Sequence, residues 1–480
     1  METRRPTYLY LLSLCMLSSF SLTLSFHKKF SPIDNYLINC GSAVDSSVFN
    51  RRFFSDHDFF NSESPLVLSR RTIPVANQNP LPNSPQIYQT VRVFEKPSKY
   101  VFQIKDRGTH MVRLHFNPFV SSNWDLNEAR FHVLVDGYVV LSNFSALNAA
   151  NPVIKEYMLW VDSDKLVVTF VPVERGNFGF VNAIEVISAP KDLIADVATV
   201  VNGDKIEKIA GLTKQALENV YRINVGGYKL TPFNDTLWRT WIPDDEFFKS
   251  SDYSKKVYFS GYIMYGAGLA SREVAPDFVY GTARTILTKN ASIPQVNMTW
   301  KFPVDGGYRY LVRMHFCDIA SIALGLLNFN VYVNGYLAYE NLDLSSITYM
   351  LAAPFYADFV VDGGSSDVLT VSIGPSNMSL GYAVDGILNG LEIMKMNNSM
   401  GSLDGTVCAG MIWKNWPRKS IGVLVPLIAV ICLVLSVSMI FRRRKATRNS
   451  VPWAKLPTDE TDTKNGNQGN NYHSEQGVSA

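Results

Sequence analysis

Carboxylates and histidines are the residues of this sequence that could perform acid–base chemistry. Hydrolysis of a glycosidic bond needs two carboxyl groups roughly 5–10 Å apart, and Asp125 and the run Asp244-Asp245-Glu246 offer them. Acidic runs are usually solvated loops, and we interpret these residues in that way. His115 and His315 each lie inside an apolar phrase, which is typical of a buried structural histidine. The sequence contains no serine nucleophile turn and no Cys/His cluster, so we predict no enzyme activity, no metal and no cofactor.

Net charge gives no argument for a nucleic acid partner. The 480 residues carry 45 Lys+Arg against 42 Asp+Glu, a net charge of +3, and nucleic acid binding depends on an excess of positive charge. Because domains have about 100–200 residues each, the length predicts roughly two to four of them.

Two apolar segments divide the chain. Residues 1–26 begin with a basic pair and continue as an apolar run, the layout of a secretory signal peptide. Residues 421–441 carry no charge and are long enough to cross a bilayer as a helix, which takes about 20 residues. The basic block from Arg442 to Lys445 marks the cytoplasmic side. We therefore expect a single-pass type I protein of the plasma membrane, with its N-terminus outside and a disordered cytoplasmic tail at 442–480.

Glycosylation sequons and cysteines agree with an extracellular region between these segments. The six sequons start at Asn143, Asn234, Asn290, Asn297, Asn377 and Asn397. Outside the two apolar segments the cysteines are Cys40, Cys317 and Cys408. This odd number predicts one disulfide among the three and one remaining thiol, with the connectivity open.

The extracellular region contains a duplication. Tyr36-Leu-Ile-Asn-Cys-Gly41 returns as Tyr221-Arg-Ile-Asn-Val-Gly226, and Val112-Arg-Leu-His-Phe116 returns as Val312-Arg-Met-His-Phe316. The phrase around the turn Asp136-Gly137 returns around Asn334-Gly335. The phrases alternate apolar and polar residues, as half-buried strands do. We predict two antiparallel β-sandwich domains, at 30–190 and 218–396.

The segments that connect these domains to each other and to the membrane have other patterns. The linker is residues 191–217, and the apolar spacing from Ile206 in the linker to Val220 at the start of the second domain predicts a helix that joins the domains. Residues 397–420 are expected to form a short stalk, with Trp413 and Trp416 at the membrane interface.

With these phrases assembled, the chain resembles the malectin-like receptor kinases of plants, of the FERONIA/THESEUS type. The paired domains, the phrase that ends at Cys317, the Asn-Val-Gly-Gly227 start of the second domain and the basic stop-transfer block all match. The resemblance implies an all-β fold with two tandem malectin-like β-sandwich domains, followed by one transmembrane helix and a short disordered tail. The segment 442–480 lacks the kinase signatures, so we expect no phosphoryl transfer by this polypeptide. A kinase-less relative, a truncated product and a splice form all remain open.

The resemblance also implies where ligands bind. Animal malectin resembles each half of the region and holds glucose disaccharides with aromatic rings and an acidic residue. The corresponding ligand-binding positions are Tyr88, Phe119 and Asn177 in the first domain and Tyr280 and Asp385 in the second. Packing of the tyrosines in the core is the alternative interpretation.

The expected function is that of a cell-surface receptor-like protein involved in cell-wall sensing and signal transduction. The resemblance implies as partners secreted rapid-alkalinization-factor-type peptides, a glycosylphosphatidylinositol (GPI)-anchored co-receptor, pectin or other wall glycans, and full-length receptor kinases. The chain would signal through these partners or act as a kinase-less modulator. The alternative is a membrane-anchored lectin that binds wall polysaccharide.

Overall fold

The computed structural model describes residues 30–57, 66–68, 72–147, 151–203, 205–249, 254–266, 268–286, 297–363, 367–379, 386–416 and 424–448. The chain divides into two compact units, Met1–Trp416 and Pro417–Ala480. The predicted signal segment, Asn290 and Asp385 lie outside the described residues, as does the tail beyond Arg448.

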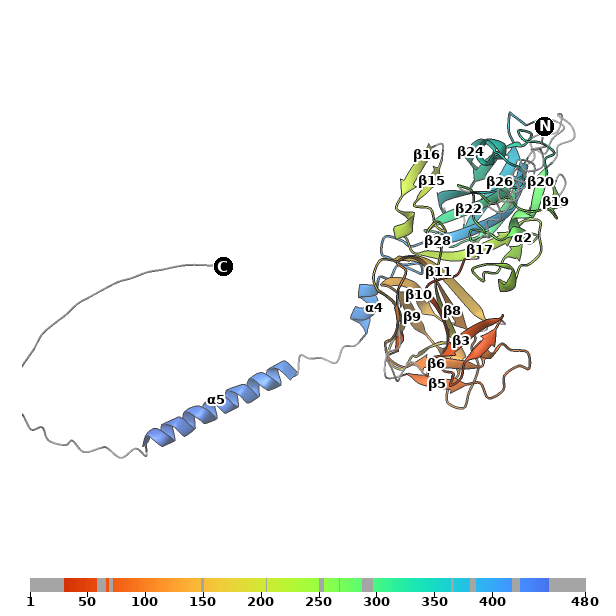
Figure 1. Ribbon diagram of the computed structural model, residues 1–480. Helices are drawn as coiled ribbons and strands as arrows, with labels where there is room; N and C mark the ends of the chain where they lie inside the picture. The colour runs from red at the N-terminus through yellow and green to blue at the C-terminus, as the bar shows by residue number, and fades with distance from the viewer. Residues whose placement is uncertain are drawn as a thin grey trace, which may run out of the picture. The chain divides into compact units, whose positions relative to one another are not determined.

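Strands dominate the first unit and fall into two repeats (Figure 1). The main-sheet strands of the first repeat are β1 (Asn35–Asn39), β2 (Ser46–Val48), β3 (Arg51–Ser55), β8 (Gly108–Phe116), β11 (Val153–Val161) and β14 (Ala183–Ser188). Its opposing sheet contains β4 (Leu66–Leu68), β7 (Ser98–Gln103), β9 (Phe131–Val135), β10 (Tyr138–Phe144) and β12 (Lys165–Pro172), and a small sheet contains β5 (Ile73–Ala76), β6 (Thr90–Phe94) and β13 (Gly179–Val181).

The second repeat has the same plan. Its main-sheet strands are β17 (Leu217–Asn224), β18 (Ile242–Pro243), β22 (Arg309–Cys317), β25 (Pro354–Asp362) and β28 (Gly390–Met396). The opposing sheet contains β21 (Met298–Pro303), β23 (Asn328–Val333), β24 (Tyr336–Asp343) and β26 (Val368–Pro375), and the small sheet contains β19 (Ser254–Tyr258), β20 (Thr282–Ile286) and β27 (Gly386–Leu388).

Short helices lie in the connections. They are η2 (Gln86–Tyr88), η3 (Leu126–Glu128), η4 (Leu212–Lys214), η5 (Pro232–Asn234), α2 (Asp277–Tyr280), α3 (Leu344–Thr348) and α4 (Ala409–Asn415).

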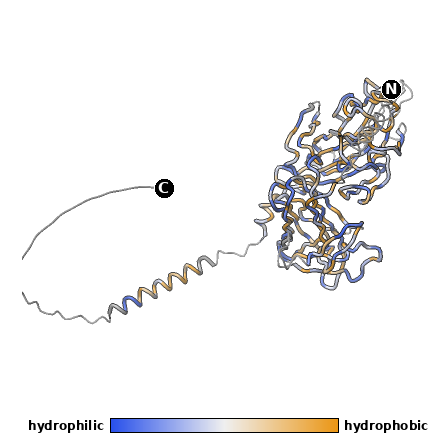
Figure 2. The backbone as a smooth tube through the Cα atoms, in the orientation of Figure 1, coloured by the Kyte–Doolittle hydropathy of each residue, from blue (hydrophilic) through white to orange (hydrophobic). Residues whose placement is uncertain are grey.

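Strand order demonstrates the duplication. The first repeat has the order β11-β8-β14-β1-β3 and the second has β25-β22-β28-β17-β18. Each repeat buries an apolar core between its main and opposing sheets; Val112 and Phe170 belong to the first core and Val312 and Val371 to the second. Buried and more exposed residues alternate along strands such as β3 and β23, and hydrophobic and hydrophilic stretches are intermixed through both repeats in Figure 2. The predicted β-rich sandwich architecture is confirmed.

The two predicted hairpin turns are also confirmed. Asp136 and Gly137 join β9 to β10 with φ of 46° and 89°, and Asn334 and Gly335 join β23 to β24 with φ of 51° and 83°. Positive φ at both central residues is the backbone of a type I′ turn, which Asn, Asp and Gly adopt most readily.

The main sheets of the repeats join edge to edge. Tyr157 and Met158 of β11 pair antiparallel with Glu218 and Leu217 of β17, and the two strands lie side by side in Figure 1. The described strands therefore include one continuous sheet of 13 strands. An apolar cluster that includes Met111, Leu217 and Leu311 packs beside this junction.

The helix predicted in the linker is wrong. The linker contains a hairpin of β15 (Val197–Asn202) and β16 (Lys205–Ala210), and β15 pairs in parallel with β25 of the second repeat. Val197-Ala-Thr-Val-Val is rich in β-branched residues, which favour strands. Leu212 and Leu217 are buried between the repeats, so their spacing reflects tertiary packing instead of one helix face.

The expected stalk is not free of the domains. We use the name strap for residues 397–416. Its Gly401 and Leu403 pair with Val139 of β10, and Leu403 is fully buried in the core of the first repeat. In α4, Ile412 packs with Trp413 and Trp416 on the outer face of the opposing sheet. We had expected these tryptophans at the membrane interface. In the structure they pack against the first repeat.

The three candidate disulfide cysteines are free thiols. Cys40 is buried in the core of the first repeat, whereas Cys317 is buried in an apolar cluster of the second. Burial raises the pKa of both thiols, so they remain protonated. The structure contains no bridge among the three: Cys40 and Cys317 lie in different repeats, and Cys408, which precedes α4, is partly buried. The expected disulfide stays a prediction.

The second unit is described over α5 (Leu424–Arg448). In Figure 2, α5 is coloured hydrophobic over most of its length and hydrophilic toward its basic C-terminal end. Among the described residues, no helix has the length and apolarity that crossing a membrane requires. The first residues of the predicted span, 421–423, lie outside the described part.

Two equivalent glycines should be indispensable for packing. Gly41 and Gly226 have φ of 75° and 70°, and a Cβ on either would overlap a carbonyl oxygen, that of Val91 or Ala283. We expect Gly41→Ala to lower the free energy of unfolding by more than about 2 kcal/mol, from left-handed strain plus the backbone clash. Gly137→Ala is the matched control, since it has φ of 89° and no heavy atom within 4 Å, and it should cost about 1 kcal/mol. Denaturant unfolding measures both, and equal losses would contradict the clash.

Candidate functional site

A row of charged side chains crosses the main sheet on the face opposite the sandwich cores. In the first repeat, Arg113 of β8 lies directly across from Glu185 of β14 and Glu156 of β11. In the second, Arg313 of β22 lies across from Glu392 of β28 and Asp358 of β25. Directly opposed residues in antiparallel strands share a face, so the register creates the row.

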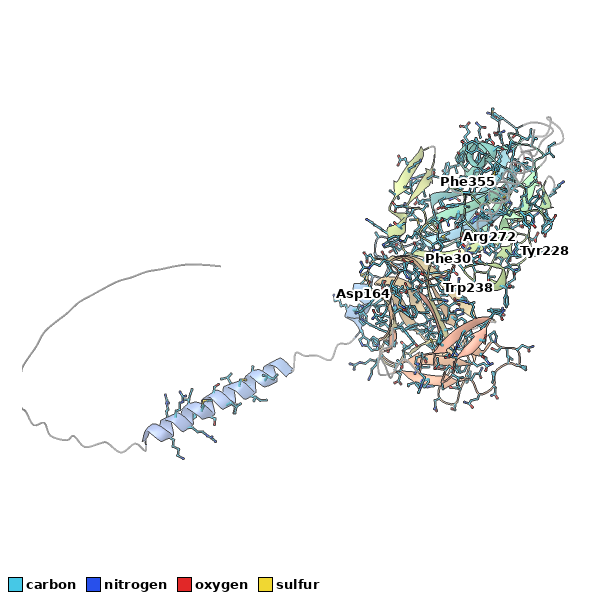
Figure 3. All side chains as sticks on the ribbon, in the orientation of Figure 1. Phe30, Asp164, Tyr228, Trp238, Arg272 and Phe355 are labelled. Carbon is cyan, nitrogen blue, oxygen red and sulfur yellow. The ribbon has the colours of Figure 1, made fainter. Side chains whose placement is uncertain are left out.

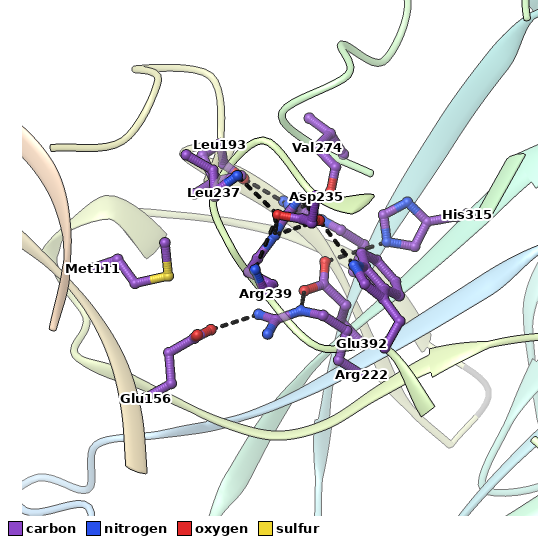
Figure 4. Close-up of polar contacts among 12 residues, drawn as sticks. Met111, Glu156, Leu193, Arg222, Asp235, Leu237, Arg239, Val274, His315 and Glu392 are labelled. Carbon is purple, nitrogen blue, oxygen red and sulfur yellow. Dashed lines mark hydrogen bonds and ion pairs between the residues drawn. The ribbon is translucent and has the colours of Figure 1, made fainter. Parts of the chain in front are cut away.

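These charges connect through the junction between repeats. Glu156 accepts from Arg113 Nε at 2.6 Å and, across the junction, from Arg222 Nη2 at 2.7 Å. Arg222 Nε then donates to Glu392 at 2.7 Å (Figure 4). At the other end, Glu185 pairs with Arg113 and with Arg51 of β3, at 2.8 and 2.6 Å. We call Arg51, Arg113, Arg222, Glu156, Glu185 and Glu392 the ion-pair chain.

A histidine and a tyrosine extend the ion-pair chain at each end. Tyr88 OH lies 3.0 Å from His115 Nδ1, and His115 Nε2 lies 3.0 Å from Glu185 Oε1. Tyr280 OH lies 3.2 Å from His315 Nδ1, and His315 Nε2 lies 3.2 Å from Glu392 Oε2. Both histidines are buried with both ring nitrogens in contact, which confirms their structural interpretation.

Connecting segments cover this charged face. Arg113 donates to the carbonyl of Leu237, and Arg313 donates to that of Leu193. Next to Leu237, Asp235 is fully buried and accepts from Arg239 Nε and Trp241 Nε1, both at 2.9 Å (Figure 4). Buried charges thus receive hydrogen bonds from backbone and side chains, as burial requires.

The ionisation of the glutamates follows from these contacts. Burial disfavours the charged form of Glu156, but Arg222 and Arg113 outweigh it and lower its pKa to about 2. Burial likewise opposes ionisation of Glu185 and Glu392, yet Arg113 and Arg222 hold their pKa values well below the ordinary range. For His315, burial lowers the pKa despite the neighbouring Glu392, so the ring is neutral.

A cleft of about 340 Å³ opens where the two repeats meet beside the ion-pair chain. Its walls come from β3, β8, β11 and β17 and from the loops around Trp238, which is labelled in Figure 3. The lining residues are Val48, Phe49, Arg51, Phe53, Ile87, Tyr88, Arg113, His115, Ile154, Glu156, Glu185, Asn219, Val220, Tyr221, Arg222, Pro232, Trp238, Thr240 and Ile242. This combination of aromatic, apolar and hydrogen-bonding groups is typical of a ligand site.

The cleft includes Tyr88 from the expected ligand-binding residues. Phe119 packs in the core of the first repeat, and Asn177 lies in the turn before β13, where its N–H donates to the carbonyl of Glu174. Tyr280 is fully buried at the end of α2. The structure does not bring Phe119 and Asn177 to the lining of this cleft, because core packing holds Phe119 elsewhere. Ligand binding by these residues stays a prediction.

Two of the acidic residues considered for hydrolysis have structural roles, whereas Asp245 and Glu246 are exposed. Asp244 is fully buried, where it accepts from Arg284 Nε at 2.5 Å, Trp300 Nε1 at 2.8 Å and the backbone of Gly226. Our interpretation of this residue as part of a solvated loop is therefore wrong. Asp125 caps η3 by accepting from the backbone N–H of Asn127.

The described sequon asparagines differ in exposure. Asn143, Asn234 and Asn377 are exposed, and Asn297 is partly buried. Asn397 is partly buried too, and its side chain accepts from Ala216 N and donates to Asn398 O.

Sequence reasoning missed most of the ion-pair chain. Arg113, Glu185 and Glu392 occupy polar positions of the repeated strand phrases, and the alternation of apolar and polar residues indicated only that these strands are half buried. One signal was available: Arg222 stands where the first repeat has Leu37. An arginine that replaces leucine in a duplicated strand indicates a new partner in the second copy.

Comparison with known proteins agrees with this geometry. The model of the malectin-like domain matches residues 38–396, so the chain belongs to the malectin-like family. The chain is 41% identical to the receptor-like protein kinase THESEUS 1 of Arabidopsis thaliana over 82% of this chain and 46% of that protein. For HERK 1 of the same plant, the identity is 36% over 95% of this chain and 54% of that protein. The chain therefore spans about half the length of these curated relatives.

Solved extracellular domains have the same fold. The ANXUR1 extracellular domain from Arabidopsis thaliana matches with a TM-score of 0.69 and 28% identity, over 78% of this chain and 99% of that one. The receptor-like kinase FER, solved with the plant peptide RALF23 and LLG2, matches with a TM-score of 0.66 and 32% identity, again over 78% and 99%.

Removal of the central carboxylate should weaken the junction. Glu156→Gln leaves Arg113 and Arg222 buried without their shared counter-charge, and we expect a loss of about 3–5 kcal/mol in unfolding free energy at pH 7. Glu128→Gln, at an exposed position, is the control and should change stability little.

The same residue should contribute to acid sensitivity. Its folded-state pKa of about 2 lies below the value of about 4.3 for an unfolded chain. The contribution of the Glu156 carboxylate to the free energy of unfolding is therefore complete above about pH 4.3 and is lost as the pH falls toward 2. Unfolding curves between pH 5 and 2 should be less steeply pH-dependent for Glu156→Gln than for wild type. Parallel curves would contradict this assignment.

Proposed function

We propose that this protein is a cell-surface receptor-like protein whose two malectin-like repeats bind secreted peptides or cell-wall carbohydrate, without catalysis of their own. The cleft at the junction carries the proposal, because it draws its walls from both repeats of a single compact unit. Ligand pockets occur preferentially at such interfaces. The family to which the chain belongs supports the same role.

The proposed partners follow from the relatives. A structure of FER with RALF23 and LLG2 exists, and the matching extracellular fold supports a peptide of that class and a co-receptor as partners here. We extend the proposal to a GPI-anchored co-receptor, to pectin or other wall glycans, and to full-length receptor kinases.

We propose a single-pass type I topology in the plasma membrane. The uncharged stretch 421–441 and the following basic block support it. The sequons at exposed Asn143, Asn234 and Asn377 support an extracellular, glycosylated first unit. The protein signals through partners or acts as a modulator, since occupancy of ligand or co-receptor lowers what remains for other receptors by mass action.

A titration separates the peptide receptor from the alternative, a membrane-anchored lectin. We expect the full-length chain in detergent to bind a rapid-alkalinization-factor-type peptide, and to bind it more tightly with the co-receptor present. Calorimetry against that peptide, a scrambled peptide, pectin and oligoglucose measures this. Binding of polysaccharide alone would establish the lectin instead.

The modulator role has its own test. Expression of the full-length chain in plant cells should reduce responses to the peptide, in proportion to the amount of protein at the surface. The Gly41→Ala variant, which we expect to fold poorly, is the control at matched transcript level. Unchanged responses at high surface expression would eliminate the modulator role.

A further inference from the structure

Aromatic side chains from both repeats gather at the cleft. Phe49, which precedes β3, meets Phe233 of η5 with ring centroids 5.7 Å apart and planes at 89°. Phe49 is 47% exposed and Phe233 is 59% exposed. Trp238 lines the same cleft, with the guanidinium of Arg51 held 4.5 Å from its ring centroid. The cleft therefore offers apolar ring faces contributed by both halves of the duplication.

Two of these aromatic residues occupy strained backbone. Phe49 has φ of 52° and forms, with Asn50 at φ of 58°, the two-residue turn between β2 and β3, and Trp238 has φ of 57°. The left-handed region costs a residue with a Cβ roughly 1–2 kcal/mol, whereas glycine adopts it freely. Such turn positions ordinarily carry Asn, Asp or Gly, so a phenylalanine at residue 49 is held there at a cost in stability. Aromatic rings thus stand at positions where glycine would favour stability.

The cleft also contains a buried donor and a buried acceptor from different repeats. Arg51 is 7% exposed, and its Nε has no hydrogen-bond partner among the described residues. The Oδ1 of Asn219 in β17 is buried and equally unpartnered within the described part of the chain. Both residues line the cleft. A hydroxyl group can accept one hydrogen bond and donate another, so one ligand class satisfies both atoms.

Charge balance indicates a neutral ligand. Three arginines and three glutamates form the ion-pair chain, and every member has an opposite charge within hydrogen-bond distance. A carboxylate entering the cleft would find no cation without a counter-charge and would lose its hydration. A neutral hydroxyl-bearing ring has no such cost.

We propose that this cleft is a glycan subsite that holds one or two neutral pyranose rings. The C–H face of a ring lies against Phe49 and Trp238, and its hydroxyls accept from Arg51 Nε–H and donate to Asn219 Oδ1. The volume of about 340 Å³ is at the small end of ligand pockets, which hold roughly 300–1,000 Å³. The subsite rests on the proposed carbohydrate-binding function. Of the malectin-derived positions, it uses only Tyr88, as part of its wall.

The test uses the full-length chain in detergent and calorimetric titration with cellobiose, laminaribiose, maltose and digalacturonate. We expect at least one neutral disaccharide to bind and digalacturonate not to bind at this site. Phe49→Gly should weaken that binding by about tenfold or more while the unfolding midpoint stays equal or rises, because glycine removes strain. Asn219→Ala should weaken it by about three- to tenfold. Phe54→Ala, an exposed aromatic on β3 outside the cleft, should bind as wild type does.

Several results would overturn the subsite. The subsite is wrong if no neutral disaccharide binds, or if the chain prefers digalacturonate. It is also wrong if the Phe49→Gly variant binds the disaccharide with wild-type affinity. A chain that binds peptide with co-receptor but no disaccharide refutes the subsite and leaves the receptor function intact. A chain that binds neither peptide nor any glycan refutes both.

Discussion

Glu156 is a buried carboxylate at the edge of the first repeat, and a buried charge must be compensated where it lies. Arg113 compensates it from the same repeat and Arg222 from the other. Strands β11 and β17 pair over only two residues each, so backbone hydrogen bonds alone specify the junction weakly. We infer that the shared carboxylate fixes the register, because slippage of β17 would break the buried pair of Arg222 with Glu156 and leave each of them with only the partner in its own repeat.

Several other buried polar groups occur in equivalent pairs in the two repeats, whereas the arginine at the junction occurs in only one of them. Asp56 and Asp244 occupy equivalent places: each accepts from a glycine N–H and pairs with a strand arginine, Arg92 or Arg284. Asn182 and Asn389 likewise each accept from the backbone at the end of the long central strand. Arg222 differs, since its counterpart is Leu37, which is buried in an apolar cluster. The arginine at this position of the repeated strand therefore supplies the ion pair that crosses the junction.

The sequence predicted the features that depend on local pattern. Period-two alternation located the repeated strands, and Asp136-Gly137 and Asn334-Gly335 located two hairpins, because turn chemistry is encoded in adjacent residues. Prediction from the sequence failed where contact with a distant segment of the chain determines whether a residue is buried. Arg113 and Glu185 stand at polar positions of strands that we expected to be half buried. The alternation does not reveal that the segments around Leu193 and Leu237 cover the polar face of these strands. The strap failed for the same reason: Trp413 and Leu403 have partners in β9, β10 and the first core that lie more than 200 residues earlier.

The strap determines how the cleft can respond to a ligand. It begins at the end of β28 in the second repeat and inserts Leu403 into the core of the first, while Tyr308 of the second repeat donates to Gly405. The two walls of the cleft are therefore joined by the β11–β17 pairing, the ion-pair chain, the apolar cluster around Leu217 and the strap. Movement of one repeat against the other would break a buried ion pair and expose a core leucine, which together cost more than a small ligand returns. Recognition in this cleft thus relies on a preformed shape, and the strained Phe49 and Trp238 belong to that preorganisation.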